Sequence, residues 1–476
     1  MQHVSTRGEA PPLGFAEVML AGLARDGGLY LPEASVSQTW PRLEVSAIAA
    51  FAGRSYAEVA VEVMRPFVGD SLAEADLARM AREAYGTFRH PAVAPLTQLG
   101  VNTFALELFH GPTLAFKDLA MQLLARLMDH ALAARGERRT IVVATSGDTG
   151  GAAVEAFRGR NQVDLVVLFP NGRISEVQRR MMTTANAANI NAIAIDGTFD
   201  NCQAIVKGMF NHHAFADRVR LSGVNSINWA RIVAQTVYYF TAAVALGAPS
   251  RRIAFAVPTG NFGDIYAGYV ALRMGLPIDR LVIATNVNDI LARTLATGAY
   301  ELRAVVPTTS PSMDIQVSSN FERLLFDAYE RNAGAVRALM GSLTQSRRFA
   351  LSGQALARIR AAFTAGRADE DEVAATIRTV KRETGNFVDP HTAVGIAVAE
   401  KEPRDPTVPM VVLATAHAAK FPDAVAAACG VRPQLPEWLA DLDQRPERVT
   451  VLPVDQSAVE RFVLGTSRAA QEGAAA

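Results

Sequence analysis

Residues 140–151 read TIVVATSGDTGG, and this stretch decides the fold. Its first six residues are mostly apolar and β-branched, which favours a strand. The loop at 146–151 follows at once, and alanines from Ala152 onward indicate a helix. A strand that passes into a helix through a short glycine-containing loop is typical of parallel α/β sheets.

The same order of strand, polar loop and helix is expected at several other places. Further apolar strands are predicted at 163–169, 190–195, 253–257 and 410–414. Ser175 with Gln178 and Asp200 with Gln203 have the spacing of helix N-caps after two of these strands. We therefore expect an α/β protein whose parallel sheets are covered by helices, with ligand groups at the carboxyl ends of the strands.

Composition limits the class of protein. The chain has 476 residues, which at ~150 residues per domain predicts about three domains or two large ones. Half the residues are hydrophobic, so a disordered chain is excluded. Lys+Arg and Asp+Glu both number 47, so no net positive field attracts nucleic acid or an anionic membrane. The two cysteines, Cys202 and Cys429, exclude a disulfide scaffold.

The apolar stretches of the sequence predict the cellular compartment of the protein. Residues 1–30 contain five charged side chains and no long apolar run, which is unlike a secretory signal peptide. Residues 233–248 are apolar but too short and too polar to span a bilayer. We expect a cytoplasmic protein without membrane or nucleic-acid partners, as a monomer or a small homo-oligomer.

Lys117 has an unusual position for a lysine. It opens a helix whose polar residues, Asp118, Gln122, Arg126 and His130, recur at a spacing of four and predict a narrow stripe facing water. A lysine in the first turn opposes the helix dipole. Apolar surroundings lower the pKa of an amine and make it a nucleophile toward carbonyl groups. From position alone, however, a surface lysine is the simpler interpretation.

Two loops have the composition of anion-binding sites. The loops at 146–151 and 259–264 each follow a strand and open a helix. Neither matches the dinucleotide fingerprint or the P-loop, and no GxSxG motif is present. Each loop alone is most simply a turn, but the two together suggest a ligand with two separate anionic groups. The neighbouring His212 and His213 form a poor metal pair, no metal site is expected, and His417 is either a site residue or structural.

In chain order, the motifs resemble those of the threonine synthase family, pyridoxal-phosphate enzymes of the tryptophan-synthase-β or type II fold. The motifs are VSTRG (4–8), DGGLYLP (26–32), HGPTLAFKD (110–118), TSGDTG (145–150), LFPNGRIS (168–175), SINWAR (226–231), GNFGD (260–264), SMDIQVSSNFER (312–323) and TAHAAKF (415–421). The resemblance covers nearly the whole chain and is nearest to the long bacterial and fungal branch. His3 and Ala418 depart from it, because family members usually have Tyr and Pro there.

The resemblance implies roles for the motif residues toward pyridoxal phosphate. Lys117 would bind the cofactor as a Schiff base and then move protons. The cofactor phosphate would be bound by the backbone of Gly260, Asn261, Phe262 and Gly263. Thr415 would bind the pyridine nitrogen, and Asp148 would lie beside the phenolic oxygen.

The resemblance also implies a substrate site. Ser146, Gly147 and Thr149 would bind the substrate carboxylate. Arg173, Arg231 and Lys207 are candidates for the substrate phosphate from their places in the loops.

The implied architecture has three parts, with the cofactor between the last two. They are a mostly helical N-terminal domain at 1–95, a smaller α/β domain at 96–215 and a larger α/β domain at 216–476. The implied reaction converts O-phospho-L-homoserine and water to L-threonine and phosphate by elimination and water addition. The alternatives are a serine/threonine dehydratase or phospho-amino-acid lyase on the same fold, and a catalytically silent homologue, which the intact Lys117 disfavours.

Overall fold

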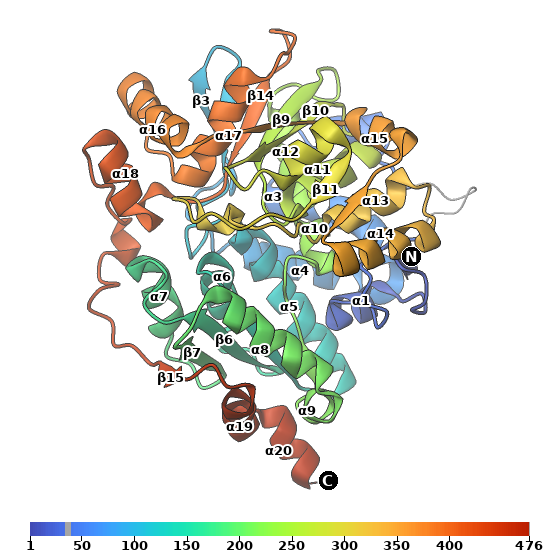
Figure 1. The fold of residues 1–476 in the computed structure, drawn as a ribbon, viewed down its shortest axis with the longest axis vertical. Coiled ribbons are helices and arrows are strands. Elements are labelled where there is room, and N and C mark those ends of the chain that lie inside the picture. The colour runs from blue at the N-terminus through green and yellow to red at the C-terminus, as the bar shows by residue number, and fades with distance from the viewer. Residues whose placement is uncertain (34–39, 476) are drawn as a thin grey trace.

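Two sheets make the frame of the computed structural model, which describes residues 1–33 and 40–475 (Figure 1). The larger sheet has the strand order β13-β10-β9-β14-β4-β3 and the smaller β15-β7-β6-β5-β8. The larger sheet is built from β3 (Leu96–Gly100), β4 (Thr103–Glu107), β9 (Ile253–Pro258), β10 (Ile278–Thr285), β13 (Phe363–Arg367) and β14 (Met410–Ala414). The smaller is built from β5 (Arg139–Ala144), β6 (Val163–Pro170), β7 (Ile190–Ile195), β8 (Leu221–Ser222) and β15 (Thr450–Leu452).

Every strand pair in these sheets is parallel except β3 with β4. Helices cover both faces, as alternate residues of β9 show. Phe255 and Val257 belong to the main apolar core, whereas Ala254 and Ala256 belong to a second core on the opposite face. A strand buried on both sides needs apolar residues at successive positions, which explains the apolar runs of the sequence. The predicted fold class is confirmed.

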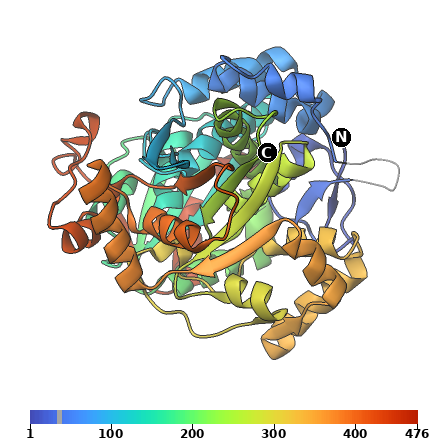
Figure 2. The ribbon, with the colours of Figure 1, turned by 90° about the horizontal axis from the view of Figure 1, so that it is seen from above.

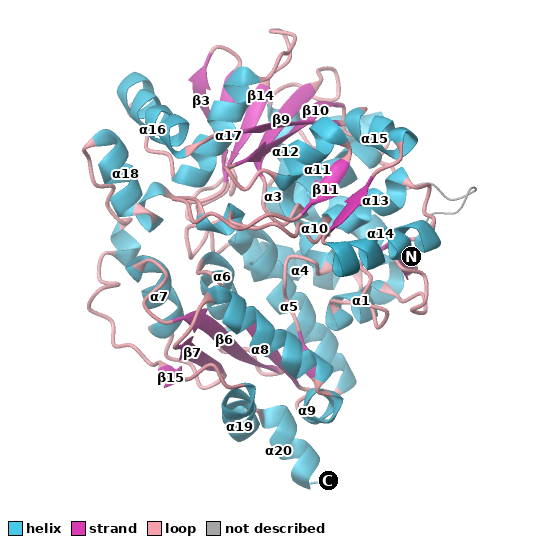
Figure 3. Cartoon of the chain, in the orientation of Figure 1, coloured by secondary structure: helices cyan, strands magenta, loops and turns pink. Residues whose placement is uncertain are grey.

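The helices of the smaller sheet include α8, which covers its strands in Figure 3. This group comprises α5 (Lys117–Arg135), α6 (Asp148–Phe157), α7 (Glu176–Thr183), α8 (Phe199–Asn211), α9 (His213–Arg218), α19 (Gln456–Thr466) and α20 (Arg468–Ala475). Around the larger sheet lie α10 (Trp229–Ala245), α11 (Gly263–Arg273), α12 (Ile290–Thr297), α13 (Phe321–Ala328), α14 (Ala333–Ser346), α15 (Gly353–Arg360), α16 (Glu370–Thr384), α17 (Pro390–Lys401) and α18 (Pro422–Cys429). Among the described residues, no helix has the length and apolar character needed to cross a membrane.

The N-terminal segment packs against α10 and α5. Its helices appear in blue along one side of the molecule in Figure 2. The segment contains β1 (His3–Ser5), α1 (Phe15–Ala21), β2 (Tyr30–Pro32), α2 (Val45–Ala49), α3 (Tyr56–Val68), η1 (Gly69–Ser71) and α4 (Glu74–Tyr85). The remaining short elements are β11 (Ala299–Glu301), η2 (Pro311–Met313), β12 (Arg348–Ala350), η3 (Ala418–Lys420) and η4 (Glu437–Leu439).

The sheets cross the expected domain boundaries at three places. β3 and β4 precede the smaller sheet in the chain but pair within the larger one. β8 lies beyond residue 215 and yet pairs with β5, and β15 returns near the C-terminus to pair with β7. Such pairing depends on tertiary contacts, which local sequence patterns do not contain. The division at 95 and 215 stays a prediction about domains, but the sheets do not follow it.

The predicted helix caps are half right. Ser175 caps α7 as expected. The pair predicted at Asp200 is wrong, because Thr198 caps α8 together with Asn201. Thr and Asp are both good N-capping residues, so the pairs Thr198–Asn201 and Asp200–Gln203 are two overlapping cap patterns in the sequence.

The predicted water-facing stripe of α5 is wrong in its first half. Asp118 and Gln122 are buried, whereas Arg126 and His130 are partly exposed. Asp118 accepts hydrogen bonds from the Thr113 backbone amide at 2.7 Å and from its hydroxyl at 2.6 Å. These bonds fix the turn that leads into α5. Burial raises the pKa of Asp118 to about 6.

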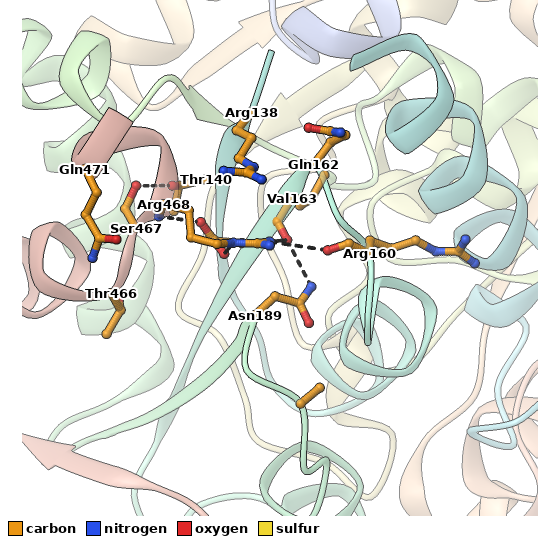
Figure 4. A network of polar contacts seen from close by, with 12 residues as sticks. Arg138, Thr140, Arg160, Gln162, Val163, Asn189, Thr466, Ser467, Arg468 and Gln471 are labelled. Carbon is orange, nitrogen blue, oxygen red and sulfur yellow. Dashed lines mark hydrogen bonds and ion pairs between the residues drawn. The ribbon is translucent and has the colours of Figure 1, made fainter. Parts of the chain in front are cut away.

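The C-terminal segment is fastened to the smaller sheet by Arg468 (Figure 4). Its backbone amide and Nε each lie 2.7 Å from a carboxylate oxygen of the buried Asp164. Its guanidinium also donates to the carbonyls of Arg160 and Val163. The hydroxyls of Ser467 and Thr140 form a hydrogen bond of 2.8 Å beside this contact. The returning chain therefore completes the smaller sheet with polar as well as apolar contacts.

Replacing Arg468 with alanine should lower the stability of the protein. Asp164 would lose a charged partner while staying buried, which costs about 1–3 kcal/mol. The midpoint of thermal unfolding measures this loss. Arg461→Ala, on the exposed face of α19, is the matched control and should cost less than about 0.5 kcal/mol. Equal losses in the two variants would contradict the anchoring role of Arg468.

Candidate active site

Lys117 begins α5 where that helix meets the end of β14. The Phe116 amide donates to the Thr415 carbonyl at 2.8 Å, and Ala115 forms a β-bridge with Ala416. These bonds join two segments that lie far apart in the sequence. Lys117 is 9% exposed, and Thr415 is buried as well. Within the described residues the Thr415 hydroxyl forms no hydrogen bond, so it is available to a ligand.

Asp148 lies between two buried lysines. Its Oδ2 is 3.4 Å from Lys117 Nζ, and its Oδ1 is 2.7 Å from Lys420 Nζ. Gln178 Nε2 also donates to Oδ1, at 2.9 Å. Burial raises the pKa of Asp148, but the charges of Lys420 and Lys117 outweigh burial and hold that pKa far below its usual range. Asp148 is therefore an anion at neutral pH.

The surface position that was the simpler interpretation for Lys117 is wrong, because the residue is buried and its pKa is lowered. Burial is the largest cause. The carboxylate of Asp148 acts in the opposite direction, while the charges of Lys420 and Arg231 add to the lowering. A lysine with a lowered pKa is more often a neutral amine, which is the form that attacks a carbonyl carbon.

The loop after β5 has backbone amides free for a ligand. The Thr145 hydroxyl accepts from the amides of Gly147 and Gly150, at 3.0 and 2.9 Å. The amides of Ser146, Asp148 and Thr149 have no acceptor within the part of the chain that the structure describes. Free amides at a helix N-terminus suit a carboxylate or a phosphate.

Only glycine fits position 147 of this loop. Its φ is 134°, and a Cβ there would lie 2.4 Å from Gln178 Cδ. Gln178 therefore reaches both the glycine and the carboxylate of Asp148. The cap of α7 and the anion loop are parts of one packed unit.

The loop after β9 also has backbone amides that are free to bind a ligand. The carbonyls of Gly260 and Asn261 accept hydrogen bonds from Ser318 and Asn320. Phe262 adopts a left-handed conformation, with φ 64°, directly before α11. The amides at positions 260–263 have no acceptor among the described residues, so they can surround a phosphate.

Arg231 is a buried cation without a counter-ion. It is 2% exposed and donates to the Val224 carbonyl at 3.1 Å, while its Nε has no partner in the structure described. No carboxylate of the described residues pairs with it, and burial lowers its pKa to about 10. A buried unpaired guanidinium is costly unless an anion is bound beside it.

The other two candidates for binding the substrate phosphate lie away from Lys117 and Asp148. Arg173 is exposed in the turn between β6 and α7, and Lys207 is exposed on α8. Neither contacts Lys117, Asp148 or Arg231 within the described residues. The structure therefore favours Arg231 among the three.

Two functional candidates, Asp264 and Lys420, were missed by the sequence interpretation. Asp264, in the first turn of α11, accepts hydrogen bonds from Tyr238 and Tyr239, and burial raises its pKa to about 7. The hydrogen bonds from the two tyrosines and the charge of Lys117 act against this increase. Lys420 is the second, and its signal was a lysine within the apolar motif TAHAAKF.

Comparison with known proteins agrees with this geometry. Family models described as "Threonine synthase N terminus", "Pyridoxal-phosphate dependent enzyme" and "Threonine synthase, C-terminal" match residues 2–85, 87–348 and 392–463. A threonine synthase of Pseudomonas aeruginosa is 53% identical over 97% of this chain and 98% of its own. The chain belongs to the threonine synthase family.

Solved threonine synthase structures share the whole architecture. The crystal structure of PLP-bound threonine synthase from Brucella melitensis is 62% identical, with a TM-score of 0.95 over 98% of this chain and 100% of that one. The yeast threonine synthase structure is 36% identical, with a TM-score of 0.91 over 98% of each chain. As a member of this family the chain is a PLP-dependent lyase, and pyridoxal phosphate is its cofactor.

Lys117 should be the residue that binds pyridoxal phosphate covalently. It is buried, its pKa is lowered, and it contacts Asp148 of the loop after β5. Borohydride reduction of the purified protein followed by peptide mass mapping should find the adduct on Lys117. Lys117→Ala should lose the adduct, whereas Lys207→Ala, at an exposed lysine, should keep it. An adduct on any other lysine would refute the assignment.

Proposed function

We propose that this enzyme converts O-phospho-L-homoserine and water into L-threonine and phosphate by elimination followed by water addition. The observation that carries the proposal is the pairing of two free-amide loops with a buried, unpaired arginine around Lys117. The cofactor phosphate, the substrate carboxylate and the substrate phosphate are three anions, and the site offers three places for them. We further propose a cytoplasmic enzyme that is a monomer or a small homo-oligomer.

Four groups would hold the cofactor. Lys117 binds it covalently, and the amides at 260–263 bind its phosphate with the help of the α11 N-terminus. The Thr415 hydroxyl binds the pyridine nitrogen. Asp148 lies beside the phenolic oxygen, where its low pKa keeps it an acceptor. When bound, pyridoxal phosphate supplies an electron sink that lets protons leave carbons near the substrate amino group.

Lys117 then serves as the base. In its free form this amine would remove the proton from Cα and help to move a proton from Cβ. Its lowered pKa suits this role, because a base must be free of its proton near neutral pH. The phosphate group would leave from Cγ, which gains a proton to become the methyl group. Water would then add at Cβ, and return of a proton to Cα would give threonine.

The loop at 146–149 orients the substrate. Ser146 and Thr149 bind the α-carboxylate through their free amides and hydroxyls, whereas Gly147, whose amide is held by the Thr145 hydroxyl, shapes the turn of the loop. A fixed carboxylate sets the direction of the Cα–H bond, which makes proton removal an intramolecular step with correct geometry. Because several protons move between neighbouring carbons, water must be excluded until its own step, and approach of the two sheets provides that exclusion.

Arg231 receives the substrate phosphate. It comes from the first turn of α10 and lies near enough to Lys117 for its charge to lower that lysine's pKa. Binding a phosphate dianion would remove the penalty of its unpaired burial. Arg173 is the second candidate, and its exposure makes it suited to approach of the substrate more than to tight binding.

Product analysis tests the proposed reaction. Purified holoenzyme with O-phospho-L-homoserine should release threonine and inorganic phosphate in equal amounts. A dehydratase or lyase on this fold would instead release a 2-oxo acid and ammonia. Formation of the 2-oxo acid without threonine would reject the proposal while leaving the cofactor assignment intact.

Replacing Arg231 with methionine should weaken substrate binding without unfolding the protein. Methionine fills a similar volume, and the lost charge-assisted bonds are worth about 1.5–3 kcal/mol, so the KM and the inhibition constant of inorganic phosphate should rise about tenfold or more. Arg173→Met is the matched control and should change both by much less. If Arg231→Met instead loses cofactor and leaves phosphate inhibition unchanged, Arg231 binds the cofactor phosphate.

A further inference from the structure

Lys420 is a second buried lysine in the active site, and no step above uses it. It is 1% exposed and ends η3, a short helix after Thr415. Its Nζ lies 2.7 Å from Asp148 Oδ1 and donates to the Thr113 carbonyl, also at 2.7 Å. It thus connects the strand end of the larger sheet with the anion loop of the smaller one.

A lysine at this position is not a default choice in this chain. The sequence contains five lysines against 42 arginines. Lys207, Lys381 and Lys401 are exposed or partly exposed, while Lys117 and Lys420 are the two in the active site. The lysine ammonium is a compact charge with several donors, which lets it contact one carboxylate oxygen and one carbonyl at the same time.

Without Lys420, Asp148 would pair with Lys117 alone. A closed, buried ion pair favours the charged form of both partners. An ammonium held in that way has no lone pair and cannot attack a carbonyl carbon or remove a proton. A carboxylate beside the reactive lysine would therefore inhibit it, unless another cation shares the carboxylate.

We propose that Lys420 is a positioning residue that takes one oxygen of Asp148 and so keeps the Lys117 amine available for reaction. The ammonium of Lys420 neutralises Asp148, and its own charge repels a proton on Lys117. Asp148 remains ionised and in place as a hydrogen-bond acceptor, but its hold on Lys117 is weakened. The 3.4 Å separation of Lys117 from Asp148, against 2.7 Å for Lys420, shows which lysine has the closer contact.

The charged groups around the two lysines agree with this role. Lys117 is faced by Asp148 from α6, Lys420 from η3, Arg231 from α10 and Asp264 from α11. Lys420 is also faced by Asp118 from α5 and by His417. Asp264, with a pKa of about 7, is only partly ionised at neutral pH, whereas Asp148 is fully ionised and is the anion that acts most strongly on Lys117.

The rate at which apoenzyme attaches pyridoxal phosphate, measured against pH, reports the pKa of Lys117. This inference rests on attachment at Lys117, but the measurement needs no substrate and is independent of threonine formation. Only the neutral amine attacks the aldehyde, so the rate rises with pH until Lys117 is deprotonated. Covalent attachment is followed by the absorbance of the bound cofactor.

Lys420→Met should move this profile upward by about one pH unit, which makes attachment roughly tenfold slower at a fixed pH below the inflection. Lys420→Arg keeps the charge and should stay near the parent profile. Asp148→Asn removes the anion and should move the profile downward. Lys401→Met, at an exposed lysine, is the matched control and should change nothing.

Opposite shifts separate this role from a purely structural one. Damage to the fold would change Lys420→Met and Asp148→Asn in the same direction, and that result would overturn the proposal. An unchanged profile in Lys420→Met would overturn it as well. If Lys420→Met does not fold, the parental profile of Lys420→Arg together with the downward shift of Asp148→Asn supports the proposal, and the lack of that downward shift rejects it.

Discussion

One carboxylate shared by two buried ammonium groups holds the active site together. Asp148 reaches Lys117 with one oxygen and Lys420 with the other, and Gln178 supports it from α7. The three partners come from three parts of the chain, so the contact exists only when both sheets are folded and adjacent. Charge balance at this point therefore depends on the whole architecture. In turn, the contact fixes where the loops after β5 and β14 meet.

The two sheets contribute to the site in the same physical way. In each, the carboxyl ends of parallel strands deliver loops with free backbone amides, and a helix begins directly after the loop. In the loop after β9, Ser318 and Asn320 bind the carbonyls and leave the amide donors free. In the loop after β5, the Thr145 hydroxyl accepts from two amides and leaves three others free within the described part of the chain. Glycine is required where the backbone turns sharply, as at Gly147.

Sequence patterns predicted local features well and long-range features poorly. The strands, the two anion loops and the start of α5 at Lys117 each have a signal within a dozen residues, so they could be predicted. The membership of β15 in the smaller sheet could not, because a three-residue strand has little pattern of its own and pairs across most of the chain. Burial of Asp118 was missed for a different reason, because helical periodicity alone predicts an exposed position and does not include the hydrogen bonds from the preceding turn. The partnership of Lys420 with Asp148 joins residues far apart in sequence and has no local signature.

The positive charge of the site also links the binding of anionic ligands to the stability of the fold. Arg231 is buried without a carboxylate partner among the described residues, and Asp148 is already divided between two lysines. The chain as a whole has no net charge, so this local excess is a feature of the site and not of the composition. Buried charge without a partner lowers the stability of the protein alone, and an anion that binds only the folded state recovers that loss by mass action. A site built in this way gives up some stability of the empty protein in exchange for tighter binding of phosphate and carboxylate groups. The same cations lower the pKa of Lys117, so the groups that bind the anions also prepare the reactive amine.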